Sequence, residues 1–167
     1  MRDAHFMEKA LEEAKAALGA GEFPVGCVIA DGTRVIASGG RVGSRGDFPN
    51  ELDHAEIIAL RRLQAVGYTG NREHLTLYST MEPCLMCFGA IIINNISRIV
   101  YAYEDVMGGG TECRLADLPP LYADASMTVI PDVMRAESLD LFRAFFSDAG
   151  QFYWQDSLLA QYTLEQV

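Results

Sequence analysis

Two short stretches, His54-Ala55-Glu56 and Pro83-Cys84-Leu85-Met86-Cys87, decide the fold of this sequence, with 26 residues between them. Two cysteines three positions apart project from one face of a helix. A proline just before them suits a helix start, where its missing N–H costs nothing. The positive end of the helix also favours thiolate, the form of cysteine that binds metal. The second stretch therefore predicts a metal site at a helix N-terminus.

The first stretch adds an imidazole ligand and a carboxylate. Two thiolates and one imidazole suit tetrahedral zinc with an open fourth position, where the pKa of a bound water is lowered to about 7. Side chains two positions apart diverge by about 200° in a regular helix. We therefore expect His54 at the entry turn of its helix and Glu56 facing the water. One zinc per chain is predicted, with His54, Cys84 and Cys87 as ligands and Glu56 as catalytic acid and base.

A structural zinc site would need a fourth protein ligand. His74 is a poor candidate, because it precedes a strand and has no helix to aim it. The missing fourth ligand favours a catalytic zinc over a structural one.

The spacing His-x-Glu, then Pro-Cys-x-x-Cys, is that of zinc nucleobase deaminases. The sequence resembles the cytidine/deoxycytidylate deaminase superfamily over about residues 7–146. Residues 54–60, HAEIIAL, and 77–90, LYSTMEPCLMCFGA, are most similar to bacterial tRNA adenosine deaminases and related cytosine and guanine deaminases. The resemblance implies a cytidine deaminase-like α/β fold, a three-layer αβα sandwich around a five-stranded mixed sheet in the order 2-1-3-4-5.

The apolar pattern predicts a compatible order of elements. A helix is expected over 6–18, and two β-rich runs flank the hairpin signal Asp31-Gly32-Thr33. This order favours helices on both faces of one sheet. We divide the chain into a deaminase domain, 1–149, and an aromatic tail, 150–167, that packs on it. The expected strands are 25–30, 34–38, 75–79, 98–103 and 127–130, and the later helices are 55–66, 84–94 and 136–146.

Three segments are expected near the substrate. Residues 39–53 form a long loop leading to His54, the triple glycine 108–110 forms a turn near the site mouth, and the tail gathers Phe152, Tyr153 and Trp154. The tail either closes over the site or caps the core, and the sequence supports both readings equally.

The resemblance implies an Asn after the second strand that hydrogen-bonds the substrate, but this sequence has Arg41 at the nearest position. Asn50, later in the same loop, is the candidate replacement. The predicted substrate contacts are Phe23, Pro24, Val25, Arg41, Asn50, Ala55, Glu82, Pro83 and Trp154.

The acidic composition bears on the substrate. Thirteen basic and 23 acidic residues give a net charge of −10, which opposes a phosphate-rich partner. We therefore expect a hydrolytic deaminase that releases ammonia from a small free base or nucleoside. The alternative is a tRNA adenosine-to-inosine deaminase, favoured by similarity in the cysteine helix and in the final strand and helix. A second alternative is a zinc-stabilised binding module without activity, in which Glu56 is dispensable.

The apolar runs and the cysteines of the sequence also lead to expectations about where the protein resides, whether it has disulfides and whether it forms oligomers. The sequence has neither a signal-peptide pattern nor a run of about 18 apolar residues, so we expect a cytoplasmic protein without a membrane partner. Cys27 reads as a buried apolar residue and Cys113 as a loop residue, and no disulfide is expected. The resemblance implies that subunits pack through the ligand helices, and a helix that is apolar nearly all round needs cover on both sides, so we expect a homodimer or larger oligomer. The apolar residues concerned are Phe88, Ile91, Ile92 and Ile93.

Overall fold

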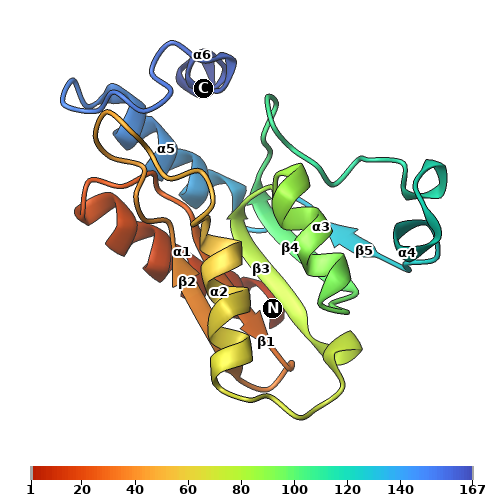
Figure 1. The fold of residues 1–167 in the computed structure, drawn as a ribbon. Coiled ribbons are helices and arrows are strands. Elements are labelled where there is room, and N and C mark those ends of the chain that lie inside the picture. Colours follow the sequence, from red (N-terminus) through yellow and green to blue (C-terminus); the bar gives the residue numbers. More distant parts are fainter. Residues whose placement is uncertain (1, 167) are drawn as a thin grey trace.

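The computed structural model describes residues 2–166 and is built on one mixed sheet with the strand order β2-β1-β3-β4-β5 (Figure 1). Strand β1 runs antiparallel to β2 and β3, whereas β4 runs parallel to β3 and β5. This confirms the predicted fold class and strand order. The strands are β1 Gly26–Ala30, β2 Val35–Gly40, β3 Thr76–Met81, β4 Arg98–Tyr103 and β5 Thr128–Ile130.

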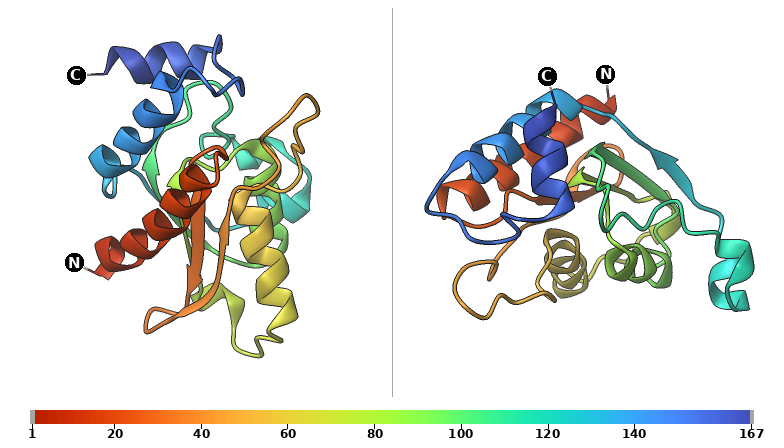
Figure 2. Two further views of the ribbon diagram at one scale, coloured as in Figure 1. Left: turned by 90° about the vertical axis from the view of Figure 1, so that its left-hand side faces the viewer. Right: turned by 90° about the horizontal axis from the view of Figure 1, so that it is seen from above.

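Helices cover both faces of the sheet, as Figure 2 shows in the view from above. Helices α1 (Arg2–Gly19) and α5 (Arg135–Ser147) lie on one face, and α2 (Ala55–Ala65) and α3 (Leu85–Ile93) lie on the other. None of the helices in residues 2–166 is long and apolar enough to cross a membrane. The shorter elements are η1 (Arg72–His74), η2 (Leu115–Asp117), α4 (Pro120–Ala123) and α6 (Leu158–Glu165).

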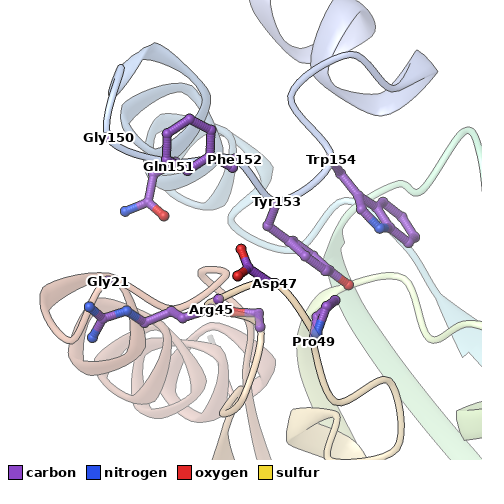
Figure 3. Close-up of a pocket in the computed structure, with 11 residues that line it drawn as sticks. Gly21, Arg45, Asp47, Pro49, Gly150, Gln151, Phe152, Tyr153 and Trp154 are labelled. Atoms are coloured by element: carbon purple, nitrogen blue, oxygen red, sulfur yellow. The ribbon is translucent and has the colours of Figure 1, made fainter.

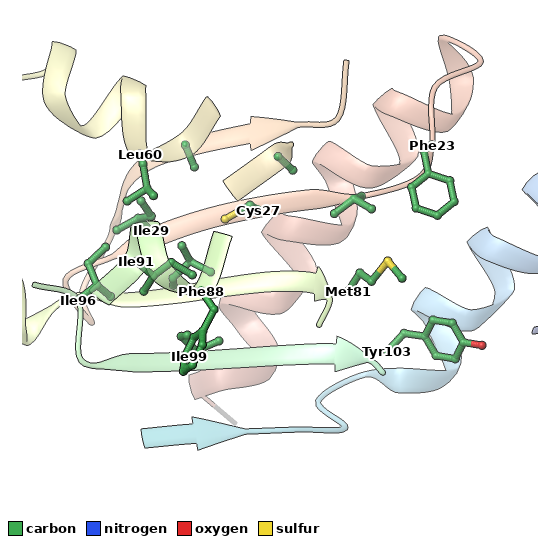
Figure 4. Packing of buried hydrophobic residues seen from close by; sticks show 14 of the residues in the cluster. Phe23, Cys27, Ile29, Leu60, Met81, Phe88, Ile91, Ile96, Ile99 and Tyr103 are labelled. Atoms are coloured by element: carbon green, nitrogen blue, oxygen red, sulfur yellow. The ribbon is translucent and has the colours of Figure 1, made fainter. Parts of the chain in front are cut away.

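Alternating side chains of the central strands divide the core between the two faces. In β1, Val28 faces the cluster built on α1, whereas Cys27 and Ile29 face α2 and α3. Figure 4 shows Cys27 and Ile29 beside Leu60 of α2 and near Phe88 of α3. Strands β1, β3 and β4 are buried almost throughout on both faces, as expected for strands that helices cover on both sides.

Gly39 allows α2 to lie directly on the edge strand β2. A Cβ atom at this position would stand 2.5 Å from the carbonyl oxygen of Ala55 and 2.8 Å from the amide nitrogen of Ala59. No real Cβ contact is that close, so a larger residue would push α2 outward. This approach fixes the first turn of α2, which carries the His54-Ala55-Glu56 motif.

An ion pair holds the first turn of α1 against the sheet, which explains why this helix begins earlier than predicted. Arg98 donates to both carboxylate oxygens of Asp3, at 3.0 and 2.9 Å, and the Tyr78 hydroxyl donates to the same side chain at 2.9 Å. The Arg98 hydrogen bonds are the main cause that lowers the pKa of Asp3 below its usual value.

We expect Asp3→Asn to lower the free energy of unfolding by about 1 kcal/mol at pH 7, because both charged side chains are about one-third exposed and screened by solvent. A lowered carboxylate pKa stabilises fully above the unfolded value of about 3.9, and that stabilisation is lost as the pH falls through the folded value. The difference between the two proteins should therefore shrink towards pH 3. Urea unfolding at several pH values measures it, and a difference independent of pH would contradict the assignment.

Candidate metal centre and active site

The structure brings the three predicted metal ligands together. The ligand atoms of His54, Cys84 and Cys87 all lie within 4.8 Å of one another, and His54 Nδ1 is 3.6 Å from each sulfur. Tetrahedral zinc with bonds of about 2.0–2.1 Å to nitrogen and 2.3 Å to sulfur separates these ligand atoms by about 3.6 Å. The donor set therefore fits zinc. No fourth His, Cys, Asp or Glu of residues 2–166 joins the group.

The ligands stand where two helices begin. His54 is the N-cap of α2 and Cys84 the N-cap of α3, both with extended backbone. Neither side chain caps its own helix by a hydrogen bond, so both are free to face the metal. The entry-turn position predicted for His54 is therefore observed. The helix start at Pro83 and Cys84 needs correction: α3 begins at Leu85 and Pro83 lies outside it, because the extended Cys84 must turn its sulfur towards His54.

The two cysteines shift each other's pKa in opposite directions. The pKa of Cys84 is lowered to about 4, chiefly by the hydrogen bond from Cys87 and also by His54. The pKa of Cys87 is raised, because its thiol donates that bond and is buried. One cysteine is thus ready as thiolate, and binding a cation releases the proton of the other.

Glu56 lies beside the ligands without joining them. The side chain is 3 % exposed, accepts a hydrogen bond from the Ser79 hydroxyl at 3.1 Å and lies 3.6 Å from the Cys87 sulfur. Burial raises the pKa of the Glu56 carboxyl. Burial weakens the preference of this carboxyl for its charged form, which suits a group that must both take up and return a proton.

A cavity of about 70 Å³ opens at His54, Cys84 and Glu56. Six of the nine predicted substrate contacts line it, and their contact with substrate stays a prediction. Pro24, Asn50 and Pro83 are not among the lining residues. The predicted residues that line the cavity are Phe23, Val25, Arg41, Ala55, Glu82 and Trp154.

Two of the predicted polar contacts, Asn50 and Glu82, already form hydrogen bonds with other groups of the protein. The Asn50 amide donates to Asp53 at 2.6 Å and accepts from the backbone of Leu52 at 2.9 Å, so it shapes the loop outside the cavity wall. Glu82 accepts hydrogen bonds from the backbone of Asp105 and from Thr111, which fixes the loop after β4. Neither residue has the free side chain that the sequence suggested.

The triple glycine lies at the site mouth, as expected, but it is anchored to the start of α3. Gly108 lines the cavity, and the amide of Gly110 donates to the Pro83 carbonyl at 2.9 Å. A Cβ at Gly110 would stand 2.6 Å from the amide nitrogen of Leu85. Only glycine permits this approach, so the loop closes one side of the cavity.

The sequence analysis missed Asp105, Met81 and Tyr153 as cavity-lining residues. Asp105 is buried, its pKa is raised by that burial, and its Oδ1 accepts from the backbone of Met107 at 3.0 Å. The sequence feature that could have identified Asp105 is its position three residues before the triple glycine 108–110. Tyr153 was visible only as one member of an aromatic cluster.

The tail both caps the core and walls the cavity. Thr163 of α6 is buried and its hydroxyl lies 2.9 Å from that of Tyr103. The stacked rings of Tyr153 and Trp154, 5.3 Å apart, pack against Phe23 and line the cavity. Phe152 is 86 % exposed and lies outside the cavity wall.

A second groove of about 470 Å³ lies on the outer side of these rings. Figure 3 shows Tyr153 reaching from the tail towards the loop that carries Asp47 and Pro49, with Trp154 beside it. The groove contains neither the metal ligands nor Glu56. Tyr153 and Trp154 therefore separate the chemical site from the outer surface.

A His-Cys-Cys metal site with a neighbouring glutamate, set between two helix N-termini on this mixed sheet, defines a zinc-dependent deaminase fold. The model for the cytidine and deoxycytidylate deaminase zinc-binding region matches residues 1–103. The chain belongs to this family. All four of its cysteines are free.

Relatives and solved structures agree with this assignment. A tRNA-specific adenosine deaminase of Agrobacterium fabrum is 36% identical over 149 residues, covering 86% of this chain and 93% of that protein. A structure from a study of A-to-I editing by tRNA:A34 deaminases is 34% identical, with a TM-score of 0.70, covering 82% of this chain and 98% of that one. The guanine deaminase of Nitrosomonas europaea, at 23% identity and a TM-score of 0.67 over 83% of this chain and 81% of that one, shares the fold.

Proposed function

We propose that this protein is a hydrolytic deaminase that replaces the exocyclic amine of a nucleobase ring by oxygen from water and releases ammonia. The observation that carries the proposal is the buried Glu56 carboxyl beside a three-ligand metal site that opens into a cavity. A binding module would need neither a cavity at the metal nor a carboxyl with a raised pKa.

Each group of residues in the site has a separate role in the proposed reaction. When bound by His54, Cys84 and Cys87, zinc supplies Lewis-acid chemistry that makes water a nucleophile at neutral pH. Glu56 would take one proton of that water and pass it to the ring nitrogen, and would then take the water's second proton and pass it to the departing amine. Ser79 holds one Glu56 oxygen and leaves the other towards the metal ligands. Tyr153 and Trp154 shield the reacting groups from bulk water.

The relatives favour adenosine in a tRNA as the substrate. The curated relatives at 31–36% identity cover 85–86% of this chain and are named for that activity. This supports the alternative from the sequence more strongly than the free small substrate first expected. The net charge of −10 opposes tRNA binding as a whole-chain average, but it leaves the distribution of charge over the surface open.

A free base is the second candidate, favoured by the tail. Tyr153 and Trp154 line a cavity of only about 70 Å³, which leaves little room for a base that is attached to a larger molecule. The assay that separates the candidates measures inosine formed in tRNA and ammonia released from free bases and nucleosides. Inosine in tRNA supports the first candidate and ammonia from free bases the second. Turnover of neither, with zinc bound, would contradict the deaminase proposal.

Trp154→Ala should raise the KM for a free base about tenfold, because stacking of a base on an aromatic side chain is worth about 1–3 kcal/mol. Phe152→Ala is the matched control, since that ring lies outside the cavity wall and is largely exposed. Steady-state kinetics of both variants test the contact. Equal KM values for the two variants would remove Trp154 from the substrate site.

We also propose a homodimer through the outer face of α3. Leu85, Met86 and Ile93 are exposed there, although Phe88 and Ile91 on the opposite side are buried in the core. Ile93→Glu should shift the protein from dimer to monomer, because a charge in an apolar interface loses its hydration. Sedimentation velocity at micromolar concentration measures this shift, and a parent protein that sediments as monomer would contradict the proposal.

A further inference from the structure

Glu51 lies where the loop before α2, the metal site and the tail meet. Its Oε2 atom accepts a hydrogen bond from the Tyr153 hydroxyl at 2.9 Å and one from Arg41 Nη2 at 3.4 Å. The same oxygen is 3.8 Å from His54 Nε2. One carboxylate thus faces a ring of the tail, a buried guanidinium and a metal ligand.

The geometry of His54 gives this contact a chemical meaning. His54 Nδ1 faces the two sulfurs, whereas Nε2 faces Glu51 on the other side of the ring. Coordination through Nδ1 requires the ring proton on Nε2, and a carboxylate beside Nε2 favours that tautomer. Metal-binding histidines are commonly held in this way by a second partner that orients the ring.

Arg41 gives the Glu51 carboxylate a charged neighbour besides His54. Its side chain is 2 % exposed, and it donates to the backbone carbonyls of Val42 and Asp53, at 2.6 and 3.0 Å. A buried guanidinium without a counter-charge is costly, and Glu51 supplies that charge. The Tyr153 ring covers Arg41, with its centroid 5.8 Å from the guanidinium carbon. Burial is the main cause that raises the pKa of Tyr153 to about 12, and the hydrogen bond to Glu51 adds to it, so the hydroxyl remains a donor.

We propose that Glu51 is a positioning residue that holds His54 in its metal-binding tautomer and orientation and, through Tyr153, ties the tail to the metal site. Loss of this carboxylate weakens zinc binding and loosens the cavity wall together. The inference rests on the metal site of the proposed function and on no particular substrate.

Zinc affinity of the full-length protein, measured by competition with a chelator in the absence of substrate, tests the inference. Glu51→Gln removes the charge at nearly constant volume, and we expect a zinc Kd 10–100 times higher, the range typical for partners of metal-binding histidines. Asp47→Asn, an exposed carboxylate of the same loop, is the matched control and should keep the parent Kd. A Kd for Glu51→Gln within twofold of this control would overturn the proposal.

Two further variants separate the contacts of Glu51. Tyr153→Phe removes only the hydroxyl, and Arg41→Met removes the buried charge, but both leave Glu51 beside His54. We expect each to keep the zinc Kd within about threefold of the parent, below the 10–100-fold range for a lost histidine partner. If Arg41→Met costs as much as Glu51→Gln, the effect passes through Arg41 and the proposal fails.

The tautomer gives a direct spectroscopic readout. In the zinc-loaded parent, the nitrogen NMR spectrum of His54 should show a protonated Nε2 and a metal-bound Nδ1. Coordination through Nε2 instead would overturn the proposal. Because neither the spectrum nor the zinc Kd involves turnover, a wrong substrate assignment leaves both outcomes unchanged.

Discussion

Glu56→Gln should fold and bind one zinc per chain, yet turn over substrate roughly 10²–10⁴ times more slowly than the parent, the usual contribution of a general acid–base group. Glutamine fills the same space and can still accept the hydrogen bond from Ser79, so the buried site keeps its packing. It cannot take up and return a proton. The effect should appear in kcat, because proton transfer belongs to the transition state rather than to substrate binding.

Three measurements on the same preparation make this test decisive. Zinc content and the thermal midpoint establish that the variant is intact, and kcat with the best substrate from the tRNA and free-base assays gives the loss. Ser79→Ala is a useful companion, because it removes the neutral partner of Glu56 but keeps the carboxylate. We expect it to lose less than Glu56→Gln. Near-parental kcat for Glu56→Gln would remove this residue from the mechanism and revive the binding-module alternative.

Cys87→Ala should purify with less than about one-tenth of a zinc ion per chain, because two of the three protein ligands cannot hold the ion in a tetrahedral site. Activity should fall with the zinc content. Cys113→Ala is the matched control: this cysteine is also free, lies outside the ligand group and should leave zinc at one ion per chain. Metal analysis by mass spectrometry after gentle purification gives both numbers.

Removal of zinc from the parent protein completes the experiment. A ligand present at 1,000 times its Kd stabilises the folded state by about 4 kcal/mol, so dialysis against a chelator should lower the thermal midpoint of the parent. Cys87→Ala should show no such further decrease. The assignment of Cys87 as a ligand would be contradicted if the Cys87→Ala variant kept one zinc per chain, or if the chelator left the thermal midpoint of the parent protein unchanged.

The sequence predicted the chemical centre well because its geometry is local. Two cysteines three positions apart at a helix start, and a histidine two positions before a glutamate, reach one point once their helices begin beside each other. The first two strands were also readable, since β-rich runs flank the hairpin signal Asp31-Gly32-Thr33. The strand order came from the resemblance to the family.

The sequence predicted the walls of the cavity less completely, because loops form them. Asn50 was expected at the substrate, but its amide bonds to its own loop, and Glu82 is used by the backbone after β4. Such hydrogen bonds between side chain and backbone compete with every other use of a polar side chain. Residue type and spacing alone do not show which use prevails.

The sequence by itself was enough to predict the candidate zinc ligands, the acid–base candidate Glu56 and the α/β class, because each motif is short with a characteristic spacing and the order of helices and strands can be read from periodicity. Only the tertiary structure decided that Tyr153 of the tail meets Glu51 and Arg41 beside His54. Those contacts join segments about 100 positions apart. Their formation depends on how two irregular segments pack against the finished sheet, and no local period encodes that packing.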